Sequence, residues 1–554
     1  MKKFYGLTGT KLNIAIAIVA GTDFALFGYD QGVMGGLLTL QSFLKFFPEI
    51  DTQKPPPGST ASHTATIQAI TVGSYTLGCF FGAVATIWLG NLLGRKRTIF
   101  IGSVIMIIGA TLQTASFGLP QLIVGRWITG FGNGMNTSTV PTWQSETSKP
   151  HRRGQMVMIE GSLIVFGVML SYWLDLGFSF LEPSSIAWRF PIGFQIVLAI
   201  FILIAIPGLP ESPRWLILKG RDDDALDVLA ALSNLPREDK KIQQEFLAVK
   251  DVVFEMSKGG FRECFKFNRN RNFHRTVLAY VNQMFQQISG INLVTYYAAT
   301  IFENSIHLSP FLSRLLSACN GTEYWMASWI AIFTIEKFGR RPLMIFGAAG
   351  MSMSMAVLAG TTSSFGSASM GLAATVFLFV FNSFFAIGWL GMTWLYPAEI
   401  TPLDIRAPAN AISTTANWAF NFMVVMVTPV AFATIGYKTY IIFAVINLAM
   451  VPSVYFFFPE TAGRSLEEMD EIFHKTTNPF DVVKVAKNLP RRYGKKGELL
   501  IDYEDTEEAR ETQRRRSSVT GAMPGVGNGG VLAQEEENKN EREHRERTDG
   551  RNGH

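Results

Sequence analysis

Long apolar runs alternate with short polar loops along most of the chain, and the length of these runs predicts its fold class. A helix needs about 20 apolar residues to cross the hydrocarbon core of a bilayer. Helices are the expected form because they satisfy their own backbone polar groups in lipid. We expect twelve membrane-spanning helices, near residues 12–39, 66–90, 98–117, 120–142, 157–178, 189–207, 274–300, 309–335, 342–361, 371–396, 407–434 and 437–458. The pattern predicts an all-α polytopic membrane protein.

Two longer stretches lack this apolar pattern. Residues 208–273 form a charged connector with helix-like sequence such as DDDALDVLAALSNL, from Asp222 to Leu235. Residues 459–554 form a polar tail, and from about Gly494 it has almost nothing to bury, so we expect most of it to be disordered. The predicted organisation is an N-terminal six-helix half at 1–207, a cytosolic connector at 208–273, a C-terminal six-helix half at 274–458 and a cytosolic tail at 459–554.

Basic residues in short loops favour one orientation in the membrane. They follow the second, fourth and eighth predicted spans, as GRKR (Gly94–Arg97), SKPHRRG (Ser148–Gly154) and EKFGRR (Glu336–Arg341). The positive-inside rule then places both termini in the cytosol and the loop at 40–65 outside. The first apolar run is too long for a cleavable signal peptide and has no small-residue cleavage site before Asp23. We expect a multi-pass protein of the plasma membrane.

Composition excludes several other classes of function. The formal net charge of +5 comes from loops and does not indicate nucleic-acid binding. The three cysteines, Cys79, Cys264 and Cys319, form no CxxC motif, and no histidine cluster suggests a metal site. We find no nucleophile–base pair and no phosphate-binding loop. The sequence therefore predicts neither an enzyme nor a bound cofactor.

Three sequence signals occur twice, at nearly equal offsets. The glycines of LLGRKR and KFGRRP, Gly94 and Gly339, are 245 residues apart. A glutamate followed seven residues later by an arginine recurs at an offset of 253, and a Pro-Glu motif recurs at 249; the members are Glu146 with Arg153, Glu399 with Arg406, Pro210 and Pro459. Near-equal offsets indicate one six-helix unit used twice. Two such halves describe an alternating-access transporter with its site at the midplane.

The repeated signals, together with GRWITGFGNG (Gly125–Gly134), PESPRWL and PETAGRSLEE (Pro459–Glu468), resemble the sugar porter family of the major facilitator superfamily. The resemblance covers roughly residues 10–475. NTSTVPTWQSE (Asn136–Glu146) and PETAGRSLEEMDEIF (Pro459–Phe473) are most similar to a fungal branch that includes yeast glycerol–proton symporters and fungal monosaccharide transporters. The resemblance implies the major facilitator fold.

The sequence departs from the family pattern at two places. The first cytosolic signature, normally D-x-x-G-R, has Asn91 in place of the aspartate, whereas the second copy keeps an acid, Glu336. The fifth span usually has a glutamine where Gly161 stands, with Glu160 beside it. One expected sugar hydrogen bond is therefore missing or replaced. Glu160 is either a second protonatable group or part of the cytosolic gate.

Asp30, in LFGYDQGVMGG, is a carboxylate inside the first predicted span. Such a residue costs about 2.5–3.5 kcal/mol on insertion scales, so we expect it to have a function. The resemblance implies Arg126 in the fourth span as its partner. A buried carboxyl beside an arginine stays ionised, whereas a separated and desolvated one binds a proton. Proton coupling is the leading interpretation; the alternative is a static pair that joins two spans. Asp23 is more consistent with a structural role.

Amide side chains in QMFQQISGINLVTYY (Gln283–Tyr297) suit a neutral polyhydroxyl ligand because an amide is both donor and acceptor and has no charge. The resemblance implies that the sugar contacts Gln286, Gln287, Asn292 and Tyr296, that Trp394 stacks on it, and that Asn417 replaces a common glutamine. Phe27, one helical turn before Asp30, is positioned to link substrate occupancy to protonation. The alternative is that the amides only join helices, and that the tryptophan is a core or lipid-facing residue.

Charged residues near the predicted cytosolic loops suggest a gate. We expect them to pair across the two halves when the inside is closed; they are Arg95, Glu146, Arg153, Glu211, Arg340, Glu399, Arg406 and Glu460. Single pairs at a wet surface are worth only about 0–1 kcal/mol, but a network that forms in one state can bias an equilibrium. In the tail, RRRSSV resembles a site for a basophilic kinase at Ser517 or Ser518.

The sequence thus favours a proton-coupled importer of a monosaccharide, a hexose or a pentose, with the sugar, protons and the lipid bilayer as its partners. Three alternatives stay open. One is a glycerol or polyol symporter, to which the fungal branch points. Another is an uncoupled facilitator. The third is a non-transporting sugar sensor, a class that tends to have long cytosolic tails.

Overall fold

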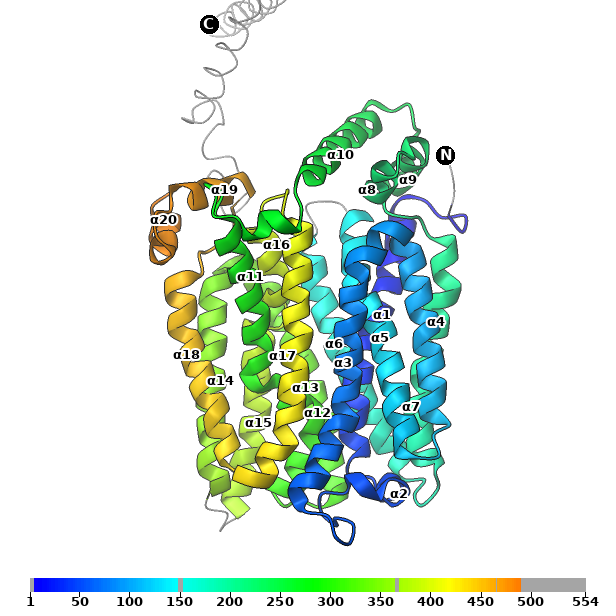
Figure 1. The fold of residues 1–554 in the computed structure, drawn as a ribbon, viewed down its shortest axis with the longest axis vertical. Helices are drawn as coiled ribbons and strands as arrows, with labels where there is room; N and C mark the ends of the chain where they lie inside the picture. Colours follow the sequence, from blue (N-terminus) through cyan, green and yellow to red (C-terminus); the bar gives the residue numbers. More distant parts are fainter. Residues whose placement is uncertain (1–3, 148–152, 364–367, 465, 490–554) are drawn as a thin grey trace, which may run out of the picture. The chain divides into compact units, whose positions relative to one another are not determined.

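The computed structural model describes residues 4–147, 153–363, 368–464 and 466–489, and helices dominate these ranges (Figure 1). No strand is assigned in this part of the chain; its one isolated bridge joins Phe4 and Leu7. The candidate phosphorylation sites Ser517 and Ser518 and most of the polar tail lie outside the described residues.

Each of the twelve expected spans is helical. In the first half they are α1 (Gly9–Leu37), α3 (Ala61–Leu93), α4 (Arg95–Thr114), α5 (Leu119–Thr147), α6 (Arg153–Ser179) and α7 (Ile186–Ala205). In the second half they are α11 (Asn272–Gln286) with η5 (Gln287–Ile291) and α12 (Asn292–Thr300), α13 (Pro310–Phe338), α14 (Arg340–Ser363), α15 (Ala368–Gly388) with α16 (Met392–Ile400), α17 (Arg406–Ile435) and α18 (Lys438–Phe457). Two spans are therefore broken into shorter helices.

Nine helical segments of the described chain are long and apolar enough to cross a membrane. The three expected spans outside this set are α5, α11–α12 and α13. These helices bury polar side chains inside the protein, such as Arg126 in α5 and Arg314 in α13. Their lower apolar content therefore reflects the polar interior that they line, because ionisable residues within a membrane face the interior of the bundle.

The predicted connector is helical, as its sequence indicated. It contains η3 (Ile206–Gly208), α8 (Pro213–Leu218), α9 (Asp222–Ser233), α10 (Lys240–Lys258) and η4 (Phe261–Phe265). The Ser212 side chain caps α8 by accepting from the backbone N–H of Trp215. Helix α9 ends at Asn234 in the left-handed conformation that asparagine tolerates. This confirms the helix expected near Asp222–Leu235.

The remaining short elements lie in loops and in the first part of the tail. They are α2 (Gln41–Phe46), η1 (Pro48–Ile50), η6 (Ile301–Ser305), α19 (Leu466–Lys475), η7 (Pro479–Asp481) and α20 (Val482–Asn488). Within residues 4–489, α8, α9, α10 and α19 lie at one end of the long helices, and α2 lies at the other (Figure 1). We call these the connector end and the α2 end.

The helices pack mainly within each half, and a few contacts join the halves. In the first half α1 packs on α6, and α5 packs on α3 and α4; in the second, α14 packs on α15 and α18, and α11 on α17. The halves meet where α3 contacts α17, α6 contacts α13, and α1 contacts α12. These three contacts define the interface between the halves.

Glycines allow α1 and α6 to approach closely. A Cβ atom on Gly28 would lie 1.7 Å from the carbonyl oxygen of Ile164, and one on Gly167 would lie 1.9 Å from that of Ala25. These contacts involve backbone atoms, which cannot rotate away. The small residues therefore set the distance between the two helices, as is common in membrane-helix packing.

We expect Gly28→Ala to destabilise the protein, because its Cβ requires α1 and α6 to separate. Overpacking of this kind typically costs about 1–3 kcal/mol. The measurement is the melting temperature of the detergent-solubilised protein, monitored by size-exclusion chromatography. Gly90→Ala in α3 is the matched control, since no atom lies within 4 Å of its added Cβ. Equal melting temperatures for the two variants would contradict this packing argument.

Candidate functional site

A cavity of about 50 Å³ lies between the two halves. Its polar lining consists of Gln31, Gln286, Gln287, Asn292, Thr295 and Asn417, and its aromatic lining of Phe27, Tyr324, Phe385 and Trp394. These residues come from α1, α11, η5, α12, α13, α15, α16 and α17. We call this the central cavity. It carries no charged side chain among its lining residues, so its chemistry is that of a neutral ligand.

The central cavity brings together six of the seven residues that the sequence suggested for sugar contact. Only Tyr296 is outside its lining; this side chain is fully buried. Of its polar lining, Gln31 and Thr295 were not anticipated, and of its aromatic lining, Tyr324 and Phe385 were not. Gln31 directly follows Asp30, and an amide beside an intramembrane carboxylate was a signal that could have identified it. Gly161 does not line the cavity; an added Cβ there would lie 3.5 Å from Leu390, so this position packs against the turn between α15 and α16.

The amides of the central cavity form one hydrogen-bonded chain. Asn292 donates from Nδ2 to Oε1 of Gln287 over 2.5 Å, and Gln287 donates from Nε2 to Oε1 of Gln286 over 2.9 Å. Asn417 also donates to Oε1 of Gln286, over 3.2 Å. The Gln286 amide is anchored in turn on the carbonyl of Trp389, 3.3 Å away. This chain fixes the orientation of donors and acceptors around the cavity.

A break in the seventh span explains how two of these amides meet. Residues five apart do not share a face of an α-helix, where neighbours are three or four apart. Gln287 and Asn292 are nevertheless bonded, because η5 between them is a π-helical segment. Gly290 within it has a φ of 101°, a conformation that glycine adopts without strain. Asn447 of α18 secures the break by donating to the carbonyl of Ser289 over 2.7 Å.

Asp30 and Arg126 lie close enough to interact electrostatically but do not form a direct ion pair. Asp30 is 3% exposed, and its Oδ2 has no hydrogen-bond partner. The guanidinium of Arg126 donates instead to the carbonyls of Thr71 and Val72, over 3.0 and 3.3 Å. It also lies over the ring of Tyr75, 5.3 Å from its centroid. Arg126, the predicted partner, therefore lies near Asp30, but its guanidinium is hydrogen-bonded to backbone carbonyls and not to the carboxylate.

Other carboxylates are also buried in the spans. Asp23 accepts a hydrogen bond of 2.8 Å from Asn136, which agrees with a structural role. Glu160 is 6% exposed. Asp175, which the sequence analysis missed, is 2% exposed on α6; an added Cβ on Gly36 would lie 2.4 Å from one of its carboxylate oxygens. Its place inside the fifth predicted span was the signal that could have identified it.

The repeated sequence signals form two matching backbone clamps at the connector end. Glu211 accepts from the backbone N–H groups of Arg95 and Lys96, both over 3.1 Å. Glu460 accepts from those of Arg340 and Arg341 in the same way, over 2.9 and 3.0 Å. Burial raises the pKa of Glu211 above its ordinary value, although these hydrogen bonds and the charge of Arg95 act in the opposite direction.

The glycines before the two clamps share one backbone conformation. Gly94 has φ and ψ of 88° and 174°, and Gly339 has 90° and 174°. A positive φ of this kind favours glycine. The sequence repeat is therefore also a repeat in three dimensions.

The side chains of the clamps pair within each half. Arg95 contacts Glu146 over 3.0 Å, and Arg340 contacts Glu399 over 2.7 Å. The hydroxyls of Ser212 and Thr461 donate to these two glutamates, over 2.5 and 2.6 Å. The sequence predicts pairing across the halves when the inside is closed; in this structure both pairs join helices of the same half. The paired residues are 51 and 59 positions apart, so helix packing within each half brings them together.

Two further predicted gate residues need separate mention. Arg406 donates to the carbonyl of Thr401 over 2.8 Å. The side chain of Arg153 lies outside the described part of the structure.

The replacement of the family's aspartate by Asn91 changes the contacts of the nearby arginine. Arg95 lies 3.5 Å from the Asn91 amide oxygen, whereas Arg340 in the second copy forms an ion pair of 3.1 Å with Glu336.

Comparisons with known proteins agree with this fold and site. The family model described as sugar (and other) transporter matches residues 14–473. The sugar transporter STL1 of Saccharomyces cerevisiae is 41% identical over 498 residues, which cover 88% of this chain and 86% of that protein. The MFS-type transporter oryC of Aspergillus oryzae is 38% identical over 540 residues, which cover 94% and 96%.

Among solved structures, the proton:xylose symporter XylE of E. coli is similar to this chain over the whole length of XylE. A structure of XylE bound to 6-bromo-6-deoxy-D-glucose has a TM-score of 0.71 and 25% identity, and the match covers 84% of this chain and 100% of that one. The fold is thus the major facilitator fold, with twelve membrane-spanning helices in two pseudo-symmetric halves.

The fold and the neutral cavity between its halves define a multi-pass membrane transporter rather than an enzyme. More specifically, the chain belongs to the sugar transporter family of the major facilitator superfamily, and its most similar relatives above are fungal.

Pairing within one half can be tested with double-mutant cycles at Arg95. For Arg95→Ala with Glu146→Ala we expect a coupling energy of about 0.5–3 kcal/mol, as for residues in direct contact. For Arg95→Ala with Glu399→Ala we expect additivity within about 0.5 kcal/mol. Both are measured from the unfolding of purified protein. Strong coupling in the second cycle and none in the first would restore pairing across the halves.

Proposed function

We propose that this transporter imports a monosaccharide, a hexose or a pentose, together with a proton, by alternating access across the plasma membrane. In this proposal both termini and the connector end face the cytosol. The observation that carries it is the position of Asp30 on α1. This buried carboxyl directly precedes Gln31 and follows Phe27 by three residues, and both of these line the central cavity.

The lining of the central cavity supports a sugar as the substrate. Each hydroxyl of a sugar donates and accepts, and the chain from Asn292 to Gln286 offers both functions without charge. Trp394 presents an aromatic ring, and its apolar face is suited to the C–H face of a pyranose. XylE, which shares the fold, is named as a proton:xylose symporter.

The surroundings of Asp30 support proton coupling. Burying a charge without hydrogen bonds costs much free energy, and protonation removes that charge. Asp30 Oδ2 has no hydrogen-bond partner, and Arg126 is held by backbone carbonyls instead of by the carboxylate. A small movement of α1 relative to α5 would change the distance between the two charges. Because α1 also contacts α12 of the second half, proton binding to Asp30 is then linked to the contact between the halves.

The small volume of the central cavity supports a transport cycle in which this cavity changes its size. At about 50 Å³ it is well below the roughly 300–1,000 Å³ that is usual for small-molecule sites. The site must therefore enlarge when the substrate enters. Separation of α1 from α12 and of α6 from α13, the contacts between the halves, would achieve this.

The first test is proton uptake by yeast that lack their own sugar and glycerol carriers and express this protein. We expect glucose or xylose to cause external alkalinisation, and Asp30→Asn to abolish it while labelled sugar still equilibrates. Asp23→Asn is the matched control, because it makes the same change on the same helix at a carboxyl already bonded to Asn136. Coupling should survive in it.

Each result of this test has a distinct meaning. Alkalinisation with glycerol alone would replace the monosaccharide by a polyol. Equilibration of sugar without alkalinisation in the wild type would make the protein a facilitator. Proton uptake that persists in Asp30→Asn would remove Asp30 from the coupling mechanism.

The amide chain can be tested separately. We expect Gln287→Ala to raise the KM for the transported sugar by about tenfold or more, since it removes hydrogen bonds both to the ligand and within the chain. Saturation kinetics of labelled-sugar uptake measure this, with surface expression as the reference. An unchanged KM in a well-expressed variant would place the sugar elsewhere.

A further inference from the structure

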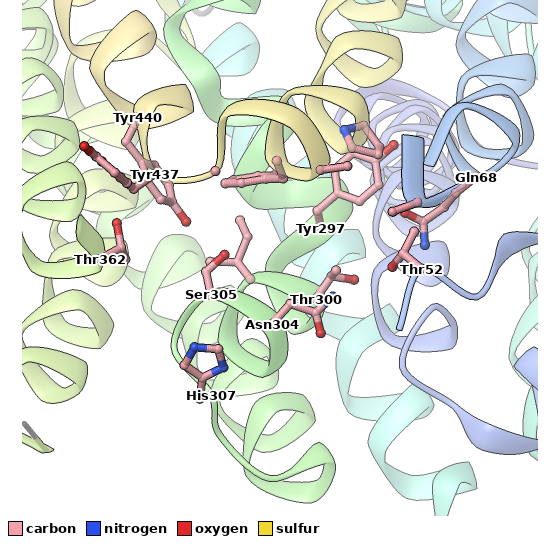
Figure 2. Close-up of a pocket in the computed structure, with 16 residues that line it drawn as sticks. Thr52, Gln68, Tyr297, Thr300, Asn304, Ser305, His307, Thr362, Tyr437 and Tyr440 are labelled. Atoms are coloured by element: carbon pink, nitrogen blue, oxygen red, sulfur yellow. The ribbon is translucent and has the colours of Figure 1, made fainter. Parts of the chain in front are cut away.

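A second and larger cavity lies at the α2 end. Its volume is about 340 Å³, compared with about 50 Å³ for the central cavity. Both halves contribute to it: Thr52 and Gln68 on one side, and Thr300, Asn304, Ser305 and Tyr440 of the second half on the other (Figure 2). We call this the outer cavity, and its volume lies in the usual range for small-molecule sites.

The outer cavity repeats the chemistry of the central one. Its 16 lining residues include no aspartate, glutamate, lysine or arginine. Hydroxyls and amides are distributed around the space, and Figure 2 shows those of Thr362, Tyr437 and Ser305 across from Gln68 and Thr52. Apart from one histidine, His307, the polar lining consists of neutral hydroxyls and amides, which are suited to a neutral polyhydroxyl molecule.

Aromatic rings form part of the wall. Phe432 and Tyr440 meet edge to face with their ring centroids 5.3 Å apart, and Tyr297 also lines the space. Rings beside hydroxyls provide both the apolar and the polar contacts that a sugar or polyol needs. The combination again matches the central cavity, where Trp394 and Phe27 lie beside amides.

Two polar atoms of this cavity lack partners within the protein. Oγ1 of Thr300 is buried without a hydrogen bond. The hydroxyl of Tyr440, a residue with 0% exposure, lies beside Ser305 but forms no hydrogen bond of ordinary geometry. Buried polar groups in proteins are rarely left without a partner. Both residues line the cavity, but the two hydroxyl atoms are turned away from its open space, so each side chain would have to rotate to bond a ligand hydroxyl.

Helix α12 connects the two cavities. Asn292 and Thr295 line the central cavity, while Tyr297 and Thr300 line the outer one. At 1.5 Å of rise per residue, Asn292 and Thr300 are about 12 Å apart along the axis. Each end of α12 joins a π-helical segment, η5 at the central cavity and η6 at the outer one. Such segments occur frequently at functional sites.

We propose that the outer cavity is a second binding site for the transported sugar or polyol, which occupies it on the way to the central cavity. The inference rests on the proposed function for the identity of its ligand. The site takes the same neutral polyhydroxyl chemistry, with Thr300, Ser305 and Tyr440 as its hydroxyl contacts. It lies on the side from which an imported substrate enters.

The test uses protection of an introduced cysteine. Ser305→Cys places a thiol in the outer cavity with little change of shape, in a full-length protein that also carries Cys319→Ser. Ser184→Cys, in the exposed loop after α6, is the matched control. Intact yeast are treated with a membrane-impermeant maleimide, with or without glucose, xylose or glycerol, and with sodium chloride of equal osmolality as the blank. Labelling of the parent is subtracted.

We expect the ligand to slow labelling at Ser305→Cys and to leave Ser184→Cys unaffected. At ten times the dissociation constant the free site, and hence the labelling rate, falls about tenfold. Protection should persist at the same concentrations when Gln287→Ala weakens the central cavity. Thr300→Val, which removes one hydroxyl, should raise the protecting concentration about two- to tenfold.

Other outcomes overturn the inference. No labelling at Ser305→Cys would mean that the cavity is not open to the outside. Equal protection at Ser184→Cys, or protection that weakens together with transport in Gln287→Ala, would mean that no separate site exists. Transport without protection refutes the outer site alone. Protection by a sugar that is not transported supports the outer site and refutes the proposed function.

Discussion

A polar group inside a bilayer has no water to bond to, and this constraint accounts for much of the structure. The three most polar spans, α5, α11–α12 and α13, are the helices that hold buried arginines and amides. Arg126 is satisfied by two backbone carbonyls, which its neighbour α3 supplies near the middle of its length. The amides of the central cavity satisfy one another. Buried polar side chains thus find partners on neighbouring helices, both within a half and, as Arg314 does at the Thr39 carbonyl, across the halves.

The same constraint separates rigid parts of the molecule from adaptable parts. At the connector end, Glu211 and Glu460 each accept two backbone N–H groups, so both clamps are fixed within their own half. In the central cavity, by contrast, amides of the second half bond to one another, and Asp30 of the first half keeps one oxygen without a partner. These side chains can exchange their present partners for a ligand or a proton, while the clamps stay fixed.

The sequence was sufficient to predict the twelve helices, since span length follows from bilayer thickness and apolar runs are unambiguous. It also indicated most of the polar residues of the central cavity, because amide side chains are unusual within apolar runs. It could not give the partner of each polar group. Whether Arg95 bonds to Glu146 or to Glu399 depends on helix positions that only tertiary packing sets. Asp175 was missed because a single carboxylate near the end of a span is easily read as part of a loop.

The outer cavity could not be predicted from the sequence for a related reason. Its lining is drawn from loops and helix ends of both halves, where serine, threonine and asparagine are common and carry no pattern. The outer cavity is distinguished by the geometry of α12. This helix lies between two π-helical segments, and its successive turns line two different cavities. Helix α12 contacts both cavities but is kinked at Tyr297, where φ and ψ are −129° and 18°. The kink separates the turn that lines the central cavity from the turn that lines the outer one, which agrees with two separate sites on one helix.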